Sequence, residues 1–321
     1  MKKWKKTACL FLSLLTLLSF TGCQQQTSIR FGAAGLGGNY YAFATAFSEL
    51  CAAQDEPYTI DVKSTAGSAA NIRLLNGNYI ELGIAQMDLV DEAYHGTGAY
   101  EKAACQGYQA IASLYTEVCQ IVVRADSSIH SLADLQGKTV SIGEAESGTE
   151  RNAKQILSLS GLNDKLVDMV NLDYTEAATA LATEKIDAAF FTAGLHLAAL
   201  EGLSDDCAIR FLAIDDTCAQ KLKAAYPFYE DTTIPANTYR GQDEDISSLG
   251  IPAVLLANET LSDDTVKQLT SFLFAHAKDL QYSLSMDLRI TEATAVKGIT
   301  IPFHAGAAEY YKENGIDVTR K

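Results

Sequence analysis

Basic residues are scarce in this chain of 321 residues, which has 25 lysines and arginines against 40 aspartates and glutamates and a net charge of −15. An acidic chain is a poor candidate for non-specific binding of nucleic acid, which needs a basic surface. Proline is also rare, with 5 residues, whereas 22 glycines suit many short loops. Hydrophobic residues make up 48% of the chain, enough for a packed core, so a disordered chain is excluded. The length suggests two domains of ordinary size or one unusually large domain.

Familiar catalytic and metal-binding motifs are missing as well. None of the five histidines lies in HExxH or beside a GxSxG nucleophile elbow. Asp173 and Asp187 are interpreted as solvated or capping carboxylates rather than a catalytic pair. The sequence therefore predicts no catalytic residue, no cofactor and no metal site, and the protein is expected not to be an enzyme.

Five cysteines follow position 23, and neither a CxxC spacing nor a histidine cluster accompanies them, which disfavours a zinc site. An odd number leaves at least one thiol unpaired within the chain. Cys105 and Cys119 flank a region that resembles a hairpin and could form a disulfide, but buried apolar thiols are an equal alternative. The five are Cys51, Cys105, Cys119, Cys207 and Cys218.

Only one apolar run approaches membrane-spanning length, from Ala8 to Phe20, after the basic segment 1–6. It is short for a permanent membrane helix but suits the apolar region of a secretory signal. Phe20-Thr-Gly-Cys23 resembles the lipobox of bacterial lipoproteins, in which the cysteine is lipidated and becomes the mature N-terminus. An ordinary signal peptide with an incidental cysteine is the alternative. The resemblance implies a signal peptide over 1–22 and a lipidated tether over 23–28 with Cys23 as the lipid anchor.

The mature protein is then expected outside the cytoplasm, anchored to the cell membrane through its lipid without crossing the membrane, and monomeric. Removal of residues 1–22 takes away four lysines and no acid, so the net charge becomes −19. Such a charge repels anionic ligands at long range, so any anion site must depend on local dipoles or a local arginine.

Strands and helices are predicted to alternate along the rest of the chain, which indicates an α/β fold with a parallel sheet. Helices are expected over 175–185, with Thr175 as the N-cap, over 194–202 and over 263–285. The pattern predicts two lobes joined by two crossings of the chain, near 118–123 and 248–256. Lobe I would comprise 29–117 plus 257–321, and lobe II 118–256. Expected strands are 29–33, 58–64, 80–85, 167–172, 187–191, 209–214 and 249–257, with separate extended runs at 109–115 and 118–124.

Three turns rich in glycine, serine and threonine follow predicted strands, at Gly35–Tyr41, Thr65–Asn71 and Gly143–Thr149. Such turns lie at the carboxyl edge of a parallel sheet, where helix N-termini offer free N–H groups to a ligand. Ordinary helix capping explains any one of them. None fits a dinucleotide- or phosphate-binding loop. Three turns from two lobes predict a closing cleft for a small molecule.

The chain resembles the TAXI-type solute receptors of TRAP transporters, which have the type II periplasmic-binding-protein-like fold, from about Ile29 to Gly315. It departs from that pattern at Gly194-Leu-His196 and lacks a proline after the first tyrosine pair. The segments that carry the resemblance are Gly35 to Tyr41; Ser64 to Ser68 with Asn71; Gln86 to Asp88; Asp134 to Lys138; Gly143 with Ser147 to Thr149; Asp187 to Phe191; Ile234 to Tyr239; and His304 to Ala307 with Tyr310, Tyr311, Glu313 and Gly315.

The resemblance implies a receptor that captures a small solute, often a carboxylate such as glutamate or a dicarboxylate, and delivers it to a TRAP permease. It places a set of ligand-binding residues at the cleft, although Gln86 and Tyr239 could equally make hinge or lobe contacts. Arg151 is the nearest cation and the rival to a cradle of neutral groups. The expected ligand-binding residues are Gly38, Asn39, Tyr40, Thr65, Gly67, Ser68, Gln86, Ser147, Gly148, Thr149, Gly194 and Tyr239.

Two alternatives stay open. The first is a binding protein of an ABC importer for a small organic ligand, with the same fold and another partner. The second is an extracytoplasmic enzyme that uses the thiol of Cys51 or Cys119, which lacks an identifiable histidine partner.

Overall fold

The computed structural model describes residues 27–54 and 56–318. The predicted signal peptide, Cys23 and most of the tether lie outside the described residues. Within these ranges, none of the helices combines the length and the apolar character that a membrane span requires.

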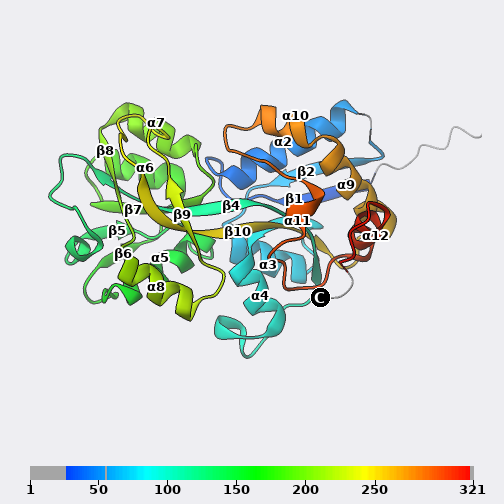
Figure 1. Cartoon of the computed structure of the whole chain (residues 1–321), viewed down its shortest axis with the longest axis horizontal. Helices are drawn as coiled ribbons and strands as arrows, with labels where there is room; N and C mark the ends of the chain where they lie inside the picture. The colour runs from blue at the N-terminus through cyan, green and yellow to red at the C-terminus, as the bar shows by residue number, and fades with distance from the viewer. Residues whose placement is uncertain (1–26, 55, 319–321) are drawn as a thin grey trace, which may run out of the picture.

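Two α/β lobes lie side by side, and strands β4 (Tyr108–Arg124) and β10 (Ile246–Asn258) run through both (Figure 1). The sheet has the order β2-β1-β3-β10-β4-β7-β5-β6, with β8 paired to β4 and β9 paired to β10. The other strands are β1 (Thr27–Gly32), β2 (Tyr58–Lys63), β3 (Leu82–Gln86), β5 (Thr139–Ser141), β6 (Asp168–Val170), β7 (Ala188–Ala193), β8 (Ile209–Leu212) and β9 (Glu230–Ile234).

Helices cover the sheet in each lobe, with α2 to α4 and α9 to α12 in one lobe and α5 to α8 in the other (Figure 1). Their bounds are α2 (Asn39–Ala53), α3 (Ser68–Asn76), α4 (Met87–His95), α5 (Gly148–Leu159), α6 (Tyr174–Ala182), α7 (Ala198–Asp206), α8 (Asp216–Ala225), α9 (Asp263–Ala275), α10 (Ala277–Ser283), α11 (Glu292–Ala295) and α12 (Ala305–Glu313).

Aromatic packing explains how α2 lies on the sheet. Phe43 and Phe47, four residues apart on one face of the helix, contact Phe31 of β1 edge to face at 6.4 and 6.5 Å between ring centroids. Phe272 of α9 meets Phe47 from the other side at 5.5 Å. Buried aromatic pairs of this geometry contribute about 0.5–1.5 kcal/mol each beyond the area they bury. These contacts hold α2, whose N-terminal end follows the first glycine-rich turn, in place on the sheet.

The two extended runs at 109–115 and 118–124 form one continuous strand, β4, and not a hairpin. β4 pairs antiparallel with β10 in both lobes and with β7 and β8 in the second lobe. Most residues of β4 are buried, so its backbone groups need these neighbouring strands as hydrogen-bond partners. The five cysteines are free thiols, so the considered pair of Cys105 and Cys119 does not form.

Three expected helix boundaries differ in the structure. Asp173, and not Thr175, caps α6, because its carboxylate accepts a hydrogen bond from Glu176 N and Glu176 reciprocates in a capping box. α7 begins at Ala198 and not at 194, after a loop in which His196 has a φ of 57°. The helix expected over 263–285 is interrupted at His276, between α9 and α10.

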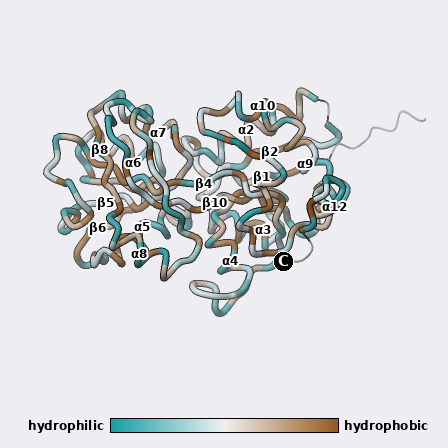
Figure 2. Tube along the Cα trace, viewed as in Figure 1, coloured by the Kyte–Doolittle hydropathy of each residue, from teal (hydrophilic) through white to brown (hydrophobic). Residues whose placement is uncertain are grey.

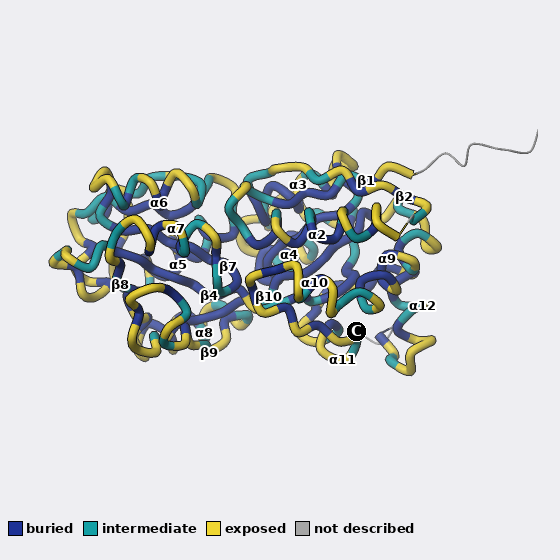
Figure 3. Tube along the Cα trace, turned by 90° about the horizontal axis from the view of Figure 1, so that it is seen from above, coloured by how far each residue is buried: buried dark blue, intermediate teal, exposed yellow. Residues whose placement is uncertain are grey.

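The apolar cores of the two lobes are separate, and their residues gather along the strands in the interior (Figure 2). The core of the first lobe includes residues of β4 up to Leu114 and residues of β10 from Ala253 onward. Cys119 of β4 and Ile251 of β10 belong to the core of the second lobe. Seen from above, buried β4 and β10 connect the lobes (Figure 3). We propose that the chain crosses between the lobes in the short stretches between these residues.

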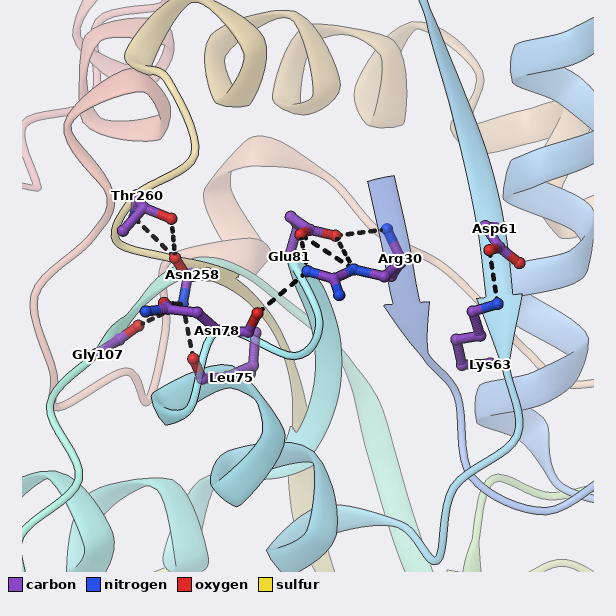
Figure 4. A network of polar contacts seen from close by, with 9 residues as sticks. All are labelled: Arg30, Asp61, Lys63, Leu75, Asn78, Glu81, Gly107, Asn258 and Thr260. Atoms are coloured by element: carbon purple, nitrogen blue, oxygen red, sulfur yellow. Dashed lines mark hydrogen bonds and ion pairs between the residues drawn. The ribbon is translucent and has the colours of Figure 1, made fainter. Parts of the chain in front are cut away.

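A polar network fixes the far end of β10 in the first lobe (Figure 4). The side-chain Nδ2 of Asn258 donates to the carbonyl oxygen of Leu75 at the end of α3, at 2.6 Å. It also donates to the carbonyl oxygen of Gly107, just before β4, at 3.2 Å. Arg30 of β1 forms an ion pair with Glu81, which precedes β3. These contacts connect β1, α3 and β10 with the segments that precede β3 and β4.

Candidate functional site

A cavity of about 360 Å³ lies between the lobes. Both lobes contribute loops that follow strands, and β4 contributes Glu117. The volume is at the lower end of the range for small-molecule sites. Its lining residues are Ala34, Gly35, Leu36, Gly37, Gly38, Asn39, Tyr40, Ser64, Ala66, Gly67, Ser68, Gln86, Glu117, Glu144, Ser147, Gly148, Thr149, Asp173, Tyr174, Thr175, Glu176, Thr192 and Ala193.

Nine of the twelve expected ligand-binding residues line this cavity, from all three predicted turns and the end of β3. They are Gly38, Asn39, Tyr40, Gly67, Ser68, Gln86, Ser147, Gly148 and Thr149.

The other three lie around the cavity without lining it. Thr65 donates to the Asn71 side chain (2.7 Å) and accepts from Ala34 N (2.9 Å), so it shapes two of the turns. A Cβ at Gly194 would lie 3.4 Å from Asn39 Cγ, which places this glycine behind the lining residues. Tyr239 is buried in the second lobe, where its hydroxyl donates to Gln120 (2.8 Å).

Two lining hydroxyls are already used inside their own lobes. Ser68 Oγ accepts a hydrogen bond from Gln86 N at 3.1 Å and lies 3.4 Å from the hydroxyl of Tyr40. Thr149 Oγ1 accepts from Thr192 N at 3.2 Å and lies 2.7 Å from the hydroxyl of Tyr174. Both hydroxyls therefore hold neighbouring wall residues in place.

Glu117 is the charged group that sequence reasoning missed. It lies in β4, opposite Ile251 of β10, is 3% exposed, and accepts a hydrogen bond from Gln86 Nε2 at 2.7 Å. Burial raises the pKa of its carboxyl to about 8, although the bond from Gln86 opposes this rise. A single acid in a long apolar strand was the signal that could have revealed it.

The turn from β6 to α6 was also missed as part of the site. It contributes Asp173, Tyr174, Thr175 and Glu176 to the lining. The signal was present, because this turn follows a predicted strand, as each of the other three turns does.

Main-chain contacts join the lobes across the mouth of the cavity. The first N–H groups of α3, from Ala69 and Ala70, donate to the carbonyl oxygen of Glu146 in the other lobe, at 3.1 and 3.2 Å. Glu146 has a φ of 66°, an unfavourable conformation for a residue with a side chain. Its carboxylate pairs with Arg73 of α3 at 2.7 Å. The N–H groups of Ala69 and Ala70 in the first turn of α3 are thus bonded to the second lobe, whereas Gly67 and Ser68 at the start of the helix line the cavity.

Arg151 of α5 does not line the cavity, so its expected alternative role as an anion ligand finds no geometric support. It reaches across to α4 in the first lobe, where its Nε lies 3.4 Å from Asp88 Oδ2 and its Nη2 pairs with Glu92. Asp88 is buried, which raises its pKa, whereas the adjacent Arg151 charge lowers it. Arg151 therefore connects the lobes.

Close approach of the lobes depends on Gly148. A Cβ at this position would lie 2.4 Å from Cδ and Oε1 of Gln86. The Gln86 side chain has little freedom to yield, because it is 1% exposed and hydrogen bonded to Glu117. The backbone at the start of α5 therefore lies directly against the first lobe.

The charge of the cavity wall is negative. Among the described residues, its lining includes four carboxylates, those of Glu117, Glu144, Asp173 and Glu176, and no lysine, arginine or histidine. The favourable end for an anion is the start of α2, whose N-cap is Gly38 and which has no side-chain cap. No group of three or more histidine, cysteine, aspartate or glutamate side chains within the described ranges could hold a metal ion.

Solved structures of other proteins have the same fold as this chain. The chain is similar to a solved protein from Bordetella bronchiseptica, with 14% identity, a TM-score of 0.57, and coverage of 91% of this chain and 99% of that one. It is also similar to a binding protein component of an ABC phosphonate transporter from Pseudomonas aeruginosa, with 16% identity, a TM-score of 0.53, and coverage of 82% and 81%. Identities this low show the fold alone, and the predicted two-lobed periplasmic-binding-protein fold is confirmed.

A family model covers nearly all of the described chain. The model of the NMT1-like family matches residues 31–315, from β1 to the second residue after α12, and so includes both lobes and all the turns that line the cavity. The chain therefore belongs to the NMT1-like family.

Proposed function

We propose that this protein is an extracytoplasmic solute-binding protein that closes its two lobes over a small organic ligand and delivers it to a membrane transporter. The observation that carries this proposal is the cavity of about 360 Å³ between lobes that are connected by two continuous strands. The family match and the fold of the solved relatives support it.

A binding role also agrees with the chemistry of the thiols. Burial raises the pKa of both Cys51 and Cys119 to about 12, so each stays a protonated, poorly nucleophilic thiol at neutral pH. Neither residue lines the cavity. These facts weigh against a thiol-dependent enzyme.

Mass spectrometry under native conditions tests the binding role. The lipid-free domain, residues 24–321, is incubated with the small-molecule fraction of a rich growth medium. We expect a protein with one bound solute, which unfolding in acid releases for identification. Absence of any bound molecule over a range of fractions would overturn the proposal.

The transporter is proposed to be of the ABC type, because the phosphonate-binding relative belongs to an ABC transporter. A TRAP permease is the second candidate, favoured by the order of the TAXI-like motifs from Gly35 to Gly315. Uptake into vesicles that contain the cognate permease distinguishes them: ATP hydrolysis drives the first, and an ion gradient drives the second.

A carboxylate on the ligand remains part of the proposal. The uncapped start of α2 beside Gly38 can donate N–H groups to it, and charge-assisted bonds of this kind contribute about 1.5–3 kcal/mol each.

Membrane attachment through Cys23 is a separate proposal that rests on the lipobox-like sequence. In cells, Cys23→Ala should move the protein from the membrane fraction to the soluble fraction and remove the mass of the acyl groups. A variant that still sediments with membranes would contradict the lipid anchor.

A further inference from the structure

Glu117 is an acid placed where the protein does not neutralise it. The residue is 3% exposed, and the carboxyl accepts a hydrogen bond of 2.7 Å from the neutral amide of Gln86. The hydroxyl of Tyr40, which is also neutral, is a second hydrogen-bonding partner that lowers the pKa of this carboxyl. The nearest arginine, Arg151, is engaged with Asp88 and Glu92. A buried charge without a cation is costly, and the nearby carboxylate of Asp88 adds repulsion that raises the pKa of Glu117 further.

Two further oxygens of the same wall lack donors. Gln86 Oε1 and Asn39 Oδ1 are buried, line the cavity and accept no hydrogen bond from the described part of the chain. The residues are 1% and 7% exposed. Because Gln86 Nε2 is committed to Glu117, the free position of that amide is an acceptor. The wall therefore offers one carboxylate and two carbonyl oxygens to a group that carries N–H donors and positive charge.

We propose that the ligand carries a protonated amine, that Glu117 binds this amine as a carboxylate, and that Gln86 and Asn39 accept its remaining hydrogens. An ammonium group has three donors and no acceptor, which matches this set. The inference deepens the proposed function and rests on it. Since the uncapped start of α2 lies beside the same cavity, the favoured class is a zwitterion that joins an amine to a carboxylate, as in an amino acid.

The inference predicts a pH dependence, because the pKa of Glu117 is about 8 in the empty protein. Below that pH the carboxyl is protonated, and an ammonium ligand must displace the proton. Affinity should therefore rise about tenfold per pH unit up to about pH 8 and then level off, with release of about one proton per ligand below that pH. A ligand without the amine would leave the proton in place and show no such rise.

Other titratable groups around Glu117 do not account for this behaviour. They are Tyr40 of α2, Asp88 of α4, Tyr115 and Cys119 of β4, and Tyr174 of α6. Burial raises the pKa values of the tyrosines and of Cys119, so these groups stay neutral below pH 8. Asp88 faces Arg151, whose charge opposes its protonation.

Calorimetry on the lipid-free domain tests the inference. The probes are the protein amino acids and, for the tightest binder, the same acid without its amine, each at about pH 6 and about pH 8 in two buffers of different ionisation enthalpy. The proteins are the wild type, Glu117→Gln and the exposed control Glu49→Gln of α2. Glutamine at 117 has nearly the same shape but cannot become charged.

We expect an amine-bearing probe to bind the wild type and Glu49→Gln, and to bind about 10- to 100-fold more weakly to Glu117→Gln, with loss of proton release. The probe without the amine should bind at least about tenfold more weakly to the wild type. Circular dichroism establishes that Glu117→Gln is folded.

The inference is overturned if the amine makes no difference, if Glu117→Gln binds as well as the wild type, or if no amino compound binds. Should native mass spectrometry still detect a bound solute without an amine, the proposed function survives and only the inference fails. Should it detect none, both fail.

Discussion

Hydroxyl groups in the cleft form hydrogen bonds with other groups of the protein. The Oγ1 of Thr149 touches Thr192 N and the Tyr174 hydroxyl, and the Tyr174 hydroxyl in turn donates to the carbonyl oxygen of Thr192 at 2.7 Å. Two elements, α5 and α6, are thereby held against the end of β7. Such a closed set of bonds keeps the wall of a site in one geometry before the ligand arrives.

Thr149→Ala should weaken solute binding by about tenfold and lower the free energy of unfolding by about 1–3 kcal/mol, because the buried N–H of Thr192 loses its acceptor. Thr149→Ser keeps the hydroxyl and should stay close to the wild type in both. Calorimetry and urea denaturation measure the two quantities. Wild-type affinity in the alanine variant would show that this bond does not position the wall.

Strand-to-helix turns are the elements that sequence reasoning predicted well. Glycines and small hydroxyl residues after an apolar run have a local cause, since they permit tight turns and cap helices. Nine expected residues from these turns and the end of β3 therefore line the cavity. Tyr239 does not line the cavity because its side chain packs in the core of its own lobe, and a local sequence pattern does not reveal which side of a loop faces a cleft.

Glu117 and Arg151 escaped prediction because their roles depend on contacts between distant elements. Glu117 acquires its place from the pairing of β4 with β10 and β7, and the break between two apolar runs suggested a hairpin there. Arg151 meets α4, 59 residues earlier in the chain at Glu92. Neither partner lies near in the sequence, so only the fold brings them together.

At the scale of elements, Arg151 of α5 should act as a latch: its ion pairs with α4 hold the two lobes together. Arg151→Ala leaves Asp88 buried without its cation and should weaken solute binding about 10- to 100-fold by favouring the open protein. Lys154→Ala is the matched control, because Lys154 lies on the same helix but pairs with Glu150 inside its own lobe. Equal affinities of the two variants, measured by calorimetry, would contradict the latch.

The molecule as a whole consists of two lobes that are connected by two continuous strands and by a few contacts between side chains and main chain of the two lobes. The first lobe has its own core and polar network, and the second has its own core. The contacts of Glu146 and Arg151 are the ones that opening would break. Hinged closure is therefore the motion this architecture permits at least cost.

Gly148→Ala should block that motion without harming the fold. The backbone at 148 suits alanine at the start of a helix, yet the added Cβ would lie 2.4 Å from Gln86 as the lobes are placed in this structure. Opening of the lobes would relieve the clash, so the fold of each lobe should tolerate the alanine. We expect unchanged thermal stability of the empty protein and at least about tenfold weaker binding. Gly202→Ala, in α7 with nothing within 4 Å of the added carbon, is the control and should bind normally. Normal binding by Gly148→Ala would argue against closure at this contact.

Small-angle X-ray scattering of the lipid-free domain, with and without a saturating amount of the solute identified by mass spectrometry, tests closure on a ligand most directly. The wild type and Gly202→Ala should show a smaller radius of gyration when the solute is bound, whereas Gly148→Ala should not contract. An identical scattering profile for the empty and the saturated wild type would contradict a two-lobed receptor that closes on its solute.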